Sequence, residues 1–147
     1  MIHVFANLCK YATAVISLLF GIVYLSKPSF LGYHKQAVQR NWEELDQQVQ
    51  TLILAPMRAL SGAALTYGFL VIVLQYQFSS SVQNWIPVTI LVSGGIIPSA
   101  PLYAMFLVKI KTAGKPPVTV VLFTVLLLVI GYLLNTYAGE AHIGGAE

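Results

Sequence analysis

The sequence predicts an all-α protein: a four-transmembrane-helix bundle with an amphipathic surface helix before the second span and a proline-broken third span. The first observation is composition, because the 147 residues are 57% hydrophobic and only 9% charged, whereas soluble domains carry roughly a quarter charged residues. The second is that the chain contains four apolar runs, each near the ~20 residues that a helix needs to cross a bilayer. We therefore expect one membrane domain over residues 1–138, followed by a flexible tail over residues 139–147.

The first span is expected over residues 4–25. Its only charge, Lys10, lies near the amino end, where the aliphatic stem can carry the ammonium outward to the membrane surface. A signal peptide is the competing interpretation. It is disfavoured because the apolar run continues past a typical signal core, and the following "LSKPSF" lacks the small residues of a cleavage site.

The segment after the first span holds most of the charge and is expected in water or at the interface. Within it, "NWEEL" is typical of a helix start, since Asn41 suits an N-cap and Glu44 stands at the capping-box position. The helix that begins here, over about residues 41–55, presents apolar side chains at three- and four-residue spacing. This pattern predicts a surface helix.

The second span is expected over residues 56–76, because ~20 residues counted back from Tyr76 reach the neighbourhood of Pro56. The pieces on either side of Pro56 are either one helix kinked at the proline or two helices that meet there.

The third span, over residues 85–108, contains Pro98 and Pro101. A proline has no backbone N–H, so Pro98 leaves the carbonyl of Gly94 without its usual donor, and Pro101 does the same to Ile97. We expect this helix to be bent or broken near mid-membrane, as is tolerated where hydroxyls, water or neighbouring helices satisfy the freed groups.

The fourth span is expected over residues 117–137, a run without charge. The segment "KIKTAGKPP" before it is typical of a helix end followed by a helix start, because it places lysines and a glycine before two prolines.

Basic residues indicate the orientation of the bundle. The loops after the first and third spans carry Lys27, Lys35, Arg40, Lys109, Lys111 and Lys115, and Arg58 enters from the same side. The opposite side has Lys10 alone among lysines and arginines. By the positive-inside rule both termini face outward and the long loop is cytoplasmic, in the inner membrane if the host is a bacterium.

The spans lack the residues that most chemistry requires. Histidines occur only outside them, at His3, His34 and His142, so no buried pair of axial haem ligands is available. All five acidic residues lie outside the spans as well, which removes the usual ionisable group of a proton-coupled carrier. No span serine has a histidine, lysine or carboxylate nearby in sequence. We expect no catalytic residue, no cofactor, no metal and no nucleic-acid partner.

Arg58 is the exception, since it lies in the apolar run "LILAPMRALSGAAL". It must face lipid phosphate, a freed carbonyl of the third span, a hydroxyl, a ligand, or an acid on another subunit. Snorkelling to phosphate is favoured by its position near the membrane edge. The alternative is a polar pocket for an anionic lipid headgroup or a quinone-like carbonyl, built from Arg58, Tyr103, Ser99, Trp42 and His34.

Two segments, "YHKQAVQRNWEELDQQVQTLILAPMRALSGAAL" and "PLYAMFLVKIKTAGKPP", resemble a pattern of small uncharacterised bacterial integral membrane proteins with four spans, of the DoxX-like kind. The resemblance covers roughly residues 33–117. It implies a four-helix inner-membrane protein with a surface helix before the second span, and it implies no substrate.

These features together favour a non-enzymatic role as an accessory or structural subunit of a larger membrane complex, or as a homo-oligomer. Small residues in "SGAAL", at Gly68 and at Gly94–Gly95 allow close approach of helices within the bundle or with a partner. The alternative is a lipid- or quinone-binding protein, or a small carrier, that uses the pocket near Arg58 and the third-span prolines. The expected partners are membrane lipids and other membrane subunits.

Overall fold

The computed structural model describes residues 2–78 and 85–143, with side chains as far as residue 137 in the last helix. Every regular element of these ranges is helical, which confirms the all-α fold class. The long helices are α1 (Ile2–Ser26), α3 (Gln47–Phe78), α4 (Trp85–Lys111) and α5 (Val118–Ile143), and the short ones are α2 (Gly32–Val38) and a 3₁₀ turn, η1 (Trp42–Glu44).

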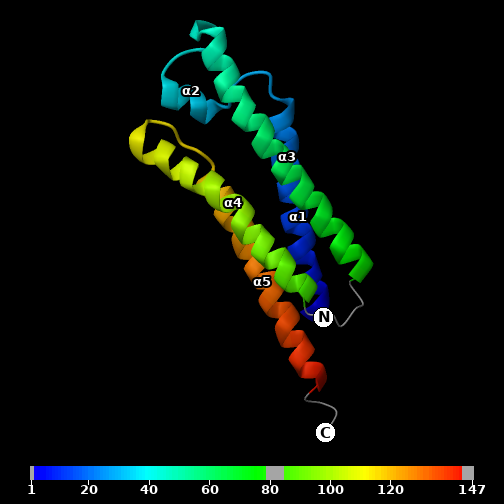
Figure 1. The fold of residues 1–147 in the computed structure, drawn as a ribbon. Coiled ribbons are helices and arrows are strands. Elements are labelled where there is room, and N and C mark those ends of the chain that lie inside the picture. Colours follow the sequence, from blue (N-terminus) through cyan, green and yellow to red (C-terminus); the bar gives the residue numbers. More distant parts are fainter. Residues whose placement is uncertain (1, 79–84, 144–147) are drawn as a thin grey trace.

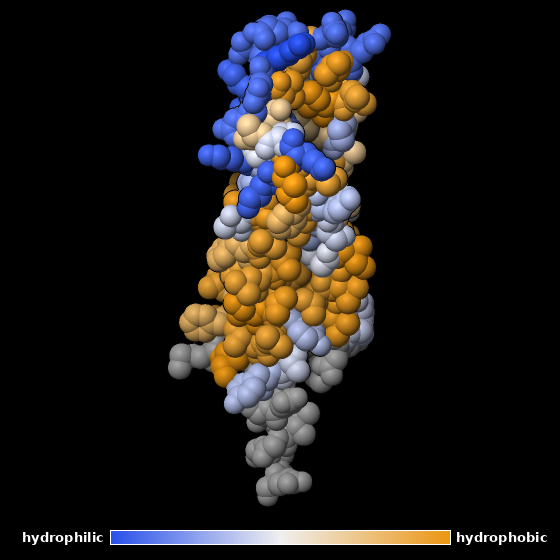
Figure 2. All heavy atoms as spheres, turned by 90° about the vertical axis from the view of Figure 1, so that its left-hand side faces the viewer, coloured by the Kyte–Doolittle hydropathy of each residue, from blue (hydrophilic) through white to orange (hydrophobic). Residues whose placement is uncertain are grey.

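The four long helices are each long and apolar enough to cross a membrane. Each predicted span lies within one of these helices, at residues 4–25, 56–76, 85–108 and 117–137. The one exception is residue 117, which immediately precedes α5. Large apolar side chains point outward from all four helices, among them Phe5, Phe69, Ile96 and Phe123, and the face of the bundle drawn in Figure 2 is broadly apolar. Such a surface needs lipid around it, so the chain is a membrane protein by helix length, composition and surface.

The helices form an elongated bundle in which α1 packs most extensively against α3 and then against α5, while α4 packs against α5 and more sparsely against α3. The start of α1 and the end of α5 lie together at one end of the bundle, which we call the terminal end (Figure 1). The other end, the loop end, carries residues 27–46 and 112–117.

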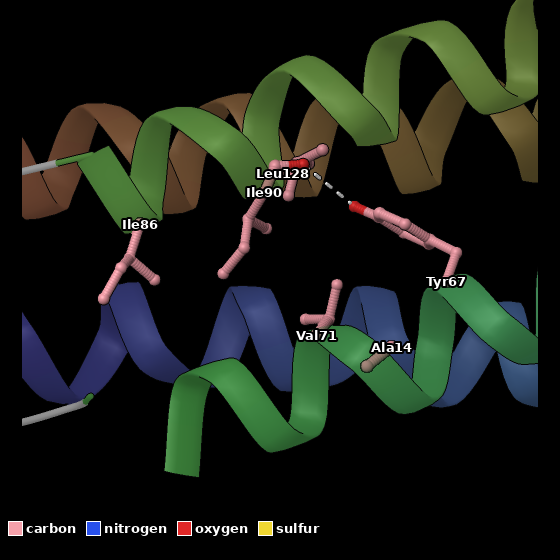
Figure 3. Packing of buried hydrophobic residues seen from close by; sticks show 6 residues of the cluster. All are labelled: Ala14, Tyr67, Val71, Ile86, Ile90 and Leu128. Carbon is pink, nitrogen blue, oxygen red and sulfur yellow. Dashed lines mark hydrogen bonds between the residues drawn. The ribbon is translucent and has the colours of Figure 1, made fainter. Parts of the chain in front are cut away.

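A cluster of buried side chains joins all four helices in the half of the bundle nearer the terminal end (Figure 3). Its members are Ala14, Tyr67, Val71, Ile86, Ile90 and Leu128. The Tyr67 hydroxyl reaches from α3 to α4 and donates to the carbonyl of Ile90 at 3.2 Å. A Cβ on Gly94 would overlap both the Tyr67 hydroxyl and Leu128, so glycine is what lets α4 approach α3 and α5 here.

The predicted surface helix over residues 41–55 is not a separate element. The expected capping interaction at its start does form, because the Asn41 N–H donates to a Glu44 carboxylate oxygen at 3.2 Å, but it begins only η1. Helix α3 then starts at Gln47 and continues through Pro56, so the single-helix alternative is the one observed. Pro56 leaves the carbonyl of Leu52 without its usual donor. Leu52 is exposed near the loop end, where polar groups outside the hydrocarbon region can donate a hydrogen bond to this carbonyl.

The predicted break in the third span is also absent, since α4 is helical through both Pro98 and Pro101. Its C-terminal part instead leans away from α3 (Figure 1). A proline bends a helix without ending it when the turns on either side stay paired. Helix α5 continues to Ile143, into the segment expected to be a tail, and residues 144–147 lie outside the described residues.

Candidate functional site

Arg58 binds the carboxyl end of α1. Its Nη1 donates to the carbonyl of Tyr24 at 2.8 Å, and its Nη2 donates to the carbonyl of Lys27 at 2.6 Å. The last carbonyls of a helix have no partner within it and carry the negative end of the helix dipole. The guanidinium therefore acts as a cap for α1. Backbone carbonyls were one of the partners that the sequence allowed for Arg58, but they were expected on the third span, and the observed ones lie at the end of the first.

Two other members of the predicted polar pocket lie on the outside of α4. The Ser99 hydroxyl donates to the Ile96 carbonyl of its own helix at 2.6 Å. The Tyr103 side chain is 67% exposed. Among the described residues, neither side chain forms a hydrogen bond with Arg58.

The remaining two members lie at the loop end, where each is held by its own segment. Trp42 packs edge-on against Phe30 with ring centroids 5.1 Å apart. The backbone N–H of Leu31 donates to His34 Nδ1 at 3.2 Å, and burial lowers the pKa of His34, so this ring is held neutral as an acceptor. Among the described residues the structure does not assemble the predicted pocket around Arg58.

Helix α2 links the loop-end segments to one another. The hydroxyls of Tyr24 and Tyr33 lie 2.8 Å apart and tie α2 to α1. On its other side, the N–H of Lys115 donates to Gln36 Oε1 at 3.2 Å, and a Cβ on Gly114 would lie 2.9 Å from the carbonyl oxygen of Tyr33. The α4–α5 loop thus lies directly on α2, which closes the loop end.

Near the terminal end, four polar side chains form a layer between the helices: Asn7, Lys10, Gln75 and Asn135. Lys10 is only 3% exposed and its Nζ donates to Asn135 Oδ1 at 3.3 Å. Gln75 Nε2 donates to Asn7 Oδ1 at 2.9 Å. The sequence predicted that the stem of Lys10 would carry its ammonium outward to the membrane surface. Its stem does run toward the terminal end, but between α1 and α5, because the absence of a side chain at Gly131 leaves room beside it.

Between this layer and the loop end lies a cavity of about 80 Å³ that all four long helices line. It starts beside Tyr67 and extends toward the loop end, where α4 leans away from α3. Its walls are formed by Thr13, Ile16, Ser17, Phe20, Leu60, Ala64, Tyr67, Gly94, Ile97, Pro98, Pro101, Val120, Val121, Thr124, Val125 and Leu128. Leu60, Ile97 and Pro101 are only partly buried, so the cavity reaches the outer surface within the apolar part of the bundle.

The four hydroxyls in the cavity wall all donate to backbone carbonyls. Their acceptors are Cys9 for Thr13 at 3.0 Å, Thr13 for Ser17 at 2.9 Å, Val120 for Thr124 at 2.8 Å and Ile90 for Tyr67 at 3.2 Å. No imidazole, thiol, amine or carboxylate is among the lining side chains. The arrangement is therefore suited to holding an apolar molecule and presents no nucleophile paired with a base.

The prolines that line this cavity are evident from the sequence as breaks in helix hydrogen bonding, whereas its hydroxyl residues were not predicted as a group. The available signal was the spacing of Thr13 and Ser17, which places both on one face of the first span. Comparison with family models, curated proteins and solved structures finds no match to this chain. The proposals below therefore depend on the geometry alone.

Proposed function

We propose that this chain is a non-enzymatic integral membrane protein that binds an apolar molecule of the bilayer, of the lipid or isoprenoid class, in the cavity between its four long helices. The observation that carries the proposal is the cavity itself, which is lined by all four long helices, almost wholly with apolar side chains. The pocket differs from the one expected near Arg58, and it lies beside Pro98 and Pro101 of the third span.

Energetics favour an occupied cavity. The lining of an apolar space of about 80 Å³ loses dispersion contacts when the space is empty, and an apolar molecule restores them. The partly exposed wall at Leu60, Ile97 and Pro101 gives an entrance within the apolar surface. Since lipid tails surround that entrance, an apolar molecule enters without being transferred through water. Binding in the cavity is then favoured over the bulk lipid by closer packing around the molecule.

Replacing Ala64 by phenylalanine tests this proposal. Ala64 is half-buried in the cavity wall, so a ring there fills the space that the ligand needs. Ala63, its exposed neighbour on α3, provides the matched control. In native mass spectrometry from lipid nanodiscs, we expect the unmodified protein and A63F to retain an apolar molecule, and A64F to retain about tenfold less, the effect of ~1.4 kcal/mol of overpacking. Equal retention by both variants would contradict the proposal.

The second candidate is the role of an accessory subunit or homo-oligomer, which the outer faces of α3 and α4 favour. A Cβ added to Gly62 or Gly95 would meet nothing within 4 Å, so these faces stay open to a neighbouring helix. The same mass spectra separate the candidates, because they report stoichiometry. A lone chain that carries an apolar molecule supports binding, whereas a stable homo-oligomer or a co-purifying protein supports the second role.

We also propose that the loop end is cytoplasmic, with both termini outside, in a bacterial inner membrane. The support is that Lys27, Lys35, Arg40, Lys109, Lys111 and Lys115 all belong to the loop end. Labelling of a cysteine introduced at Gln36 from the outer side would overturn this orientation.

A further inference from the structure

The polar side chains of the cavity wall have no hydrogen left to donate to a ligand, although their oxygen atoms can still accept. Each of the four lining hydroxyls, on Thr13, Ser17, Tyr67 and Thr124, already directs its hydrogen to a backbone carbonyl. The backbone N–H groups within the lining helices are used by the helices themselves. A ligand carbonyl or ether oxygen would therefore find no hydrogen to accept in this cavity.

Two further acceptors come from the prolines of α4. Because Pro98 and Pro101 have no N–H, the carbonyls of Gly94 and Ile97 lack their i+4 donors. All four residues line the cavity, and their spacing of three and four places them on one face of α4. The residues that carry the freed carbonyls thus lie along the cavity wall.

No protein side chain compensates for these missing donors. The hydroxyls of Ser93 and Ser99, the nearest on α4, donate to the carbonyls of Thr89, Ile90 and Ile96, and Tyr67 donates to Ile90. Within the part of the chain that the structure describes, no side-chain donor reaches the carbonyl of Gly94 or Ile97. A carbonyl that lacks its i+4 donor in an apolar, membrane-embedded helix is under-satisfied, so a hydroxyl donor on a ligand would be bound there with a gain in free energy.

We propose that the cavity selects apolar molecules that carry a hydroxyl group, such as an isoprenoid alcohol, a lipid alcohol or a hydroquinone, over the matching ether or carbonyl compounds. The proposal rests on the proposed function and names its ligand class. The ligand hydroxyl donates to the carbonyl of Gly94 or Ile97, the first carbons of its apolar chain fill the cavity of about 80 Å³, and the rest of the chain extends through the open side into the surrounding lipid. A quinone carbonyl fits less well, because the guanidinium of Arg58, which could have donated to it, caps α1 instead.

A matched pair of probes tests the selection. The protein in nanodiscs is offered geranylgeraniol and its methyl ether in equal amounts, and the two bound forms are compared by native mass spectrometry. We expect the alcohol to be bound about fivefold more, the ratio that corresponds to one hydrogen bond of ~1 kcal/mol.

Proline-to-alanine variants assign the selection to the freed carbonyls. The double variant P98A/P101A supplies both missing N–H groups, so we expect its alcohol-to-ether ratio to fall to about one. The control is Pro87→Ala, because Pro87 lies in the first turn of α4, where a backbone N–H has no acceptor within the helix. P87A should keep the ratio of the unmodified protein. A double variant that keeps that ratio would refute the role of these carbonyls.

The outcomes separate this inference from the proposed function. If the unmodified protein binds alcohol and ether equally and A64F releases both, the cavity binds apolar molecules without selecting the hydroxyl, and only the inference fails. If neither probe binds and A64F changes nothing, the proposed function fails with it. Should the double variant not fold, the ratio in the unmodified protein still decides the selection.

Discussion

The two halves of the bundle place their polar side chains in opposite ways. Near the terminal end, Lys10 bonds Asn135 across α1 and α5, and Gln75 bonds Asn7 across α3 and α1. Nearer the loop end, Ser17 donates within its own helix, as does Thr124. The first arrangement links neighbouring helices through pairs of side chains, whereas Ser17 and Thr124 add no such link, and the loop half is tied together at its end, where Arg58 of α3 bonds the end of α1.

This difference matches the packing of the two halves. The cluster around Tyr67 and Leu128 fills the space beside the linked half, whereas the cavity is lined by Ser17 and Thr124, whose hydroxyls bond within their own helices. A side chain that bonds across an interface holds two helices together, while a hydroxyl that bonds its own backbone removes itself from the interface. We infer that the direction of Ser17 and Thr124, whose hydroxyls bond their own helices, contributes to the opening between the helices at the cavity.

The largest expected effect is at the boundary between the halves. A methyl group on Gly94 would overlap the Tyr67 hydroxyl and Leu128, so Gly94→Ala should destabilise the protein by about 3 kcal/mol, the upper range for overpacking. The matched control is Gly95→Ala, where the added methyl meets nothing within 4 Å. Thermal unfolding in detergent, followed by circular dichroism, measures both, and equal midpoints would contradict the tight packing at Gly94.

An intermediate effect is expected at the loop end. Arg58→Met keeps much of the side-chain volume but removes both hydrogen bonds to the end of α1. Because the side chain is only half-buried, we expect a loss of about 1.5 kcal/mol, the low end for bonds to a charged group. Arg40→Met, at an exposed position, is the control in the same unfolding assay. If R40M lost as much stability as R58M, the effect would belong to net charge and not to the cap.

The smallest effect concerns the polar layer and needs a double-mutant cycle. K10M, N135L and the double variant isolate the energy of the bond between Lys10 and Asn135, which we expect to be about 0.6 kcal/mol, the average for hydrogen bonds between membrane helices. Unfolding free energies of the three variants and the unmodified protein give the coupling. Additive losses would show that the two side chains are neighbours without a stabilising bond.

Much of the fold follows from the sequence, because helix length and hydropathy are local properties. The four spans and the helix ends around "KIKTAGKPP" are of this kind, and the structure confirms them. The continuity of α3 and α4 through their prolines was harder to predict, since a proline removes one hydrogen bond whether or not the helix continues beyond it. Whether a helix continues through a proline depends on its packing against neighbouring helices, and the sequence of one segment does not show that packing.

The candidate site was less predictable, because its contacts join distant parts of the chain. Counting residues placed Arg58 near the membrane edge, but its acceptors at Tyr24 and Lys27 belong to another helix. Lys10 could be placed near an end of its span, whereas its partner Asn135 is 125 residues away in sequence. The carbonyls freed by Pro98 and Pro101 were evident from the sequence, and only the assembled helices show that they line a cavity.

The Arg58 cap also bears on the order in which the chain is assembled. Both of its acceptors precede α3 in the sequence, and α1 and α3 share the most extensive interface of the bundle. The cap therefore requires nothing from α4 or α5. During synthesis, the first two spans can close into a complete hairpin in the membrane while the second pair is still in the ribosome, and that hairpin then provides the surface on which the later spans assemble.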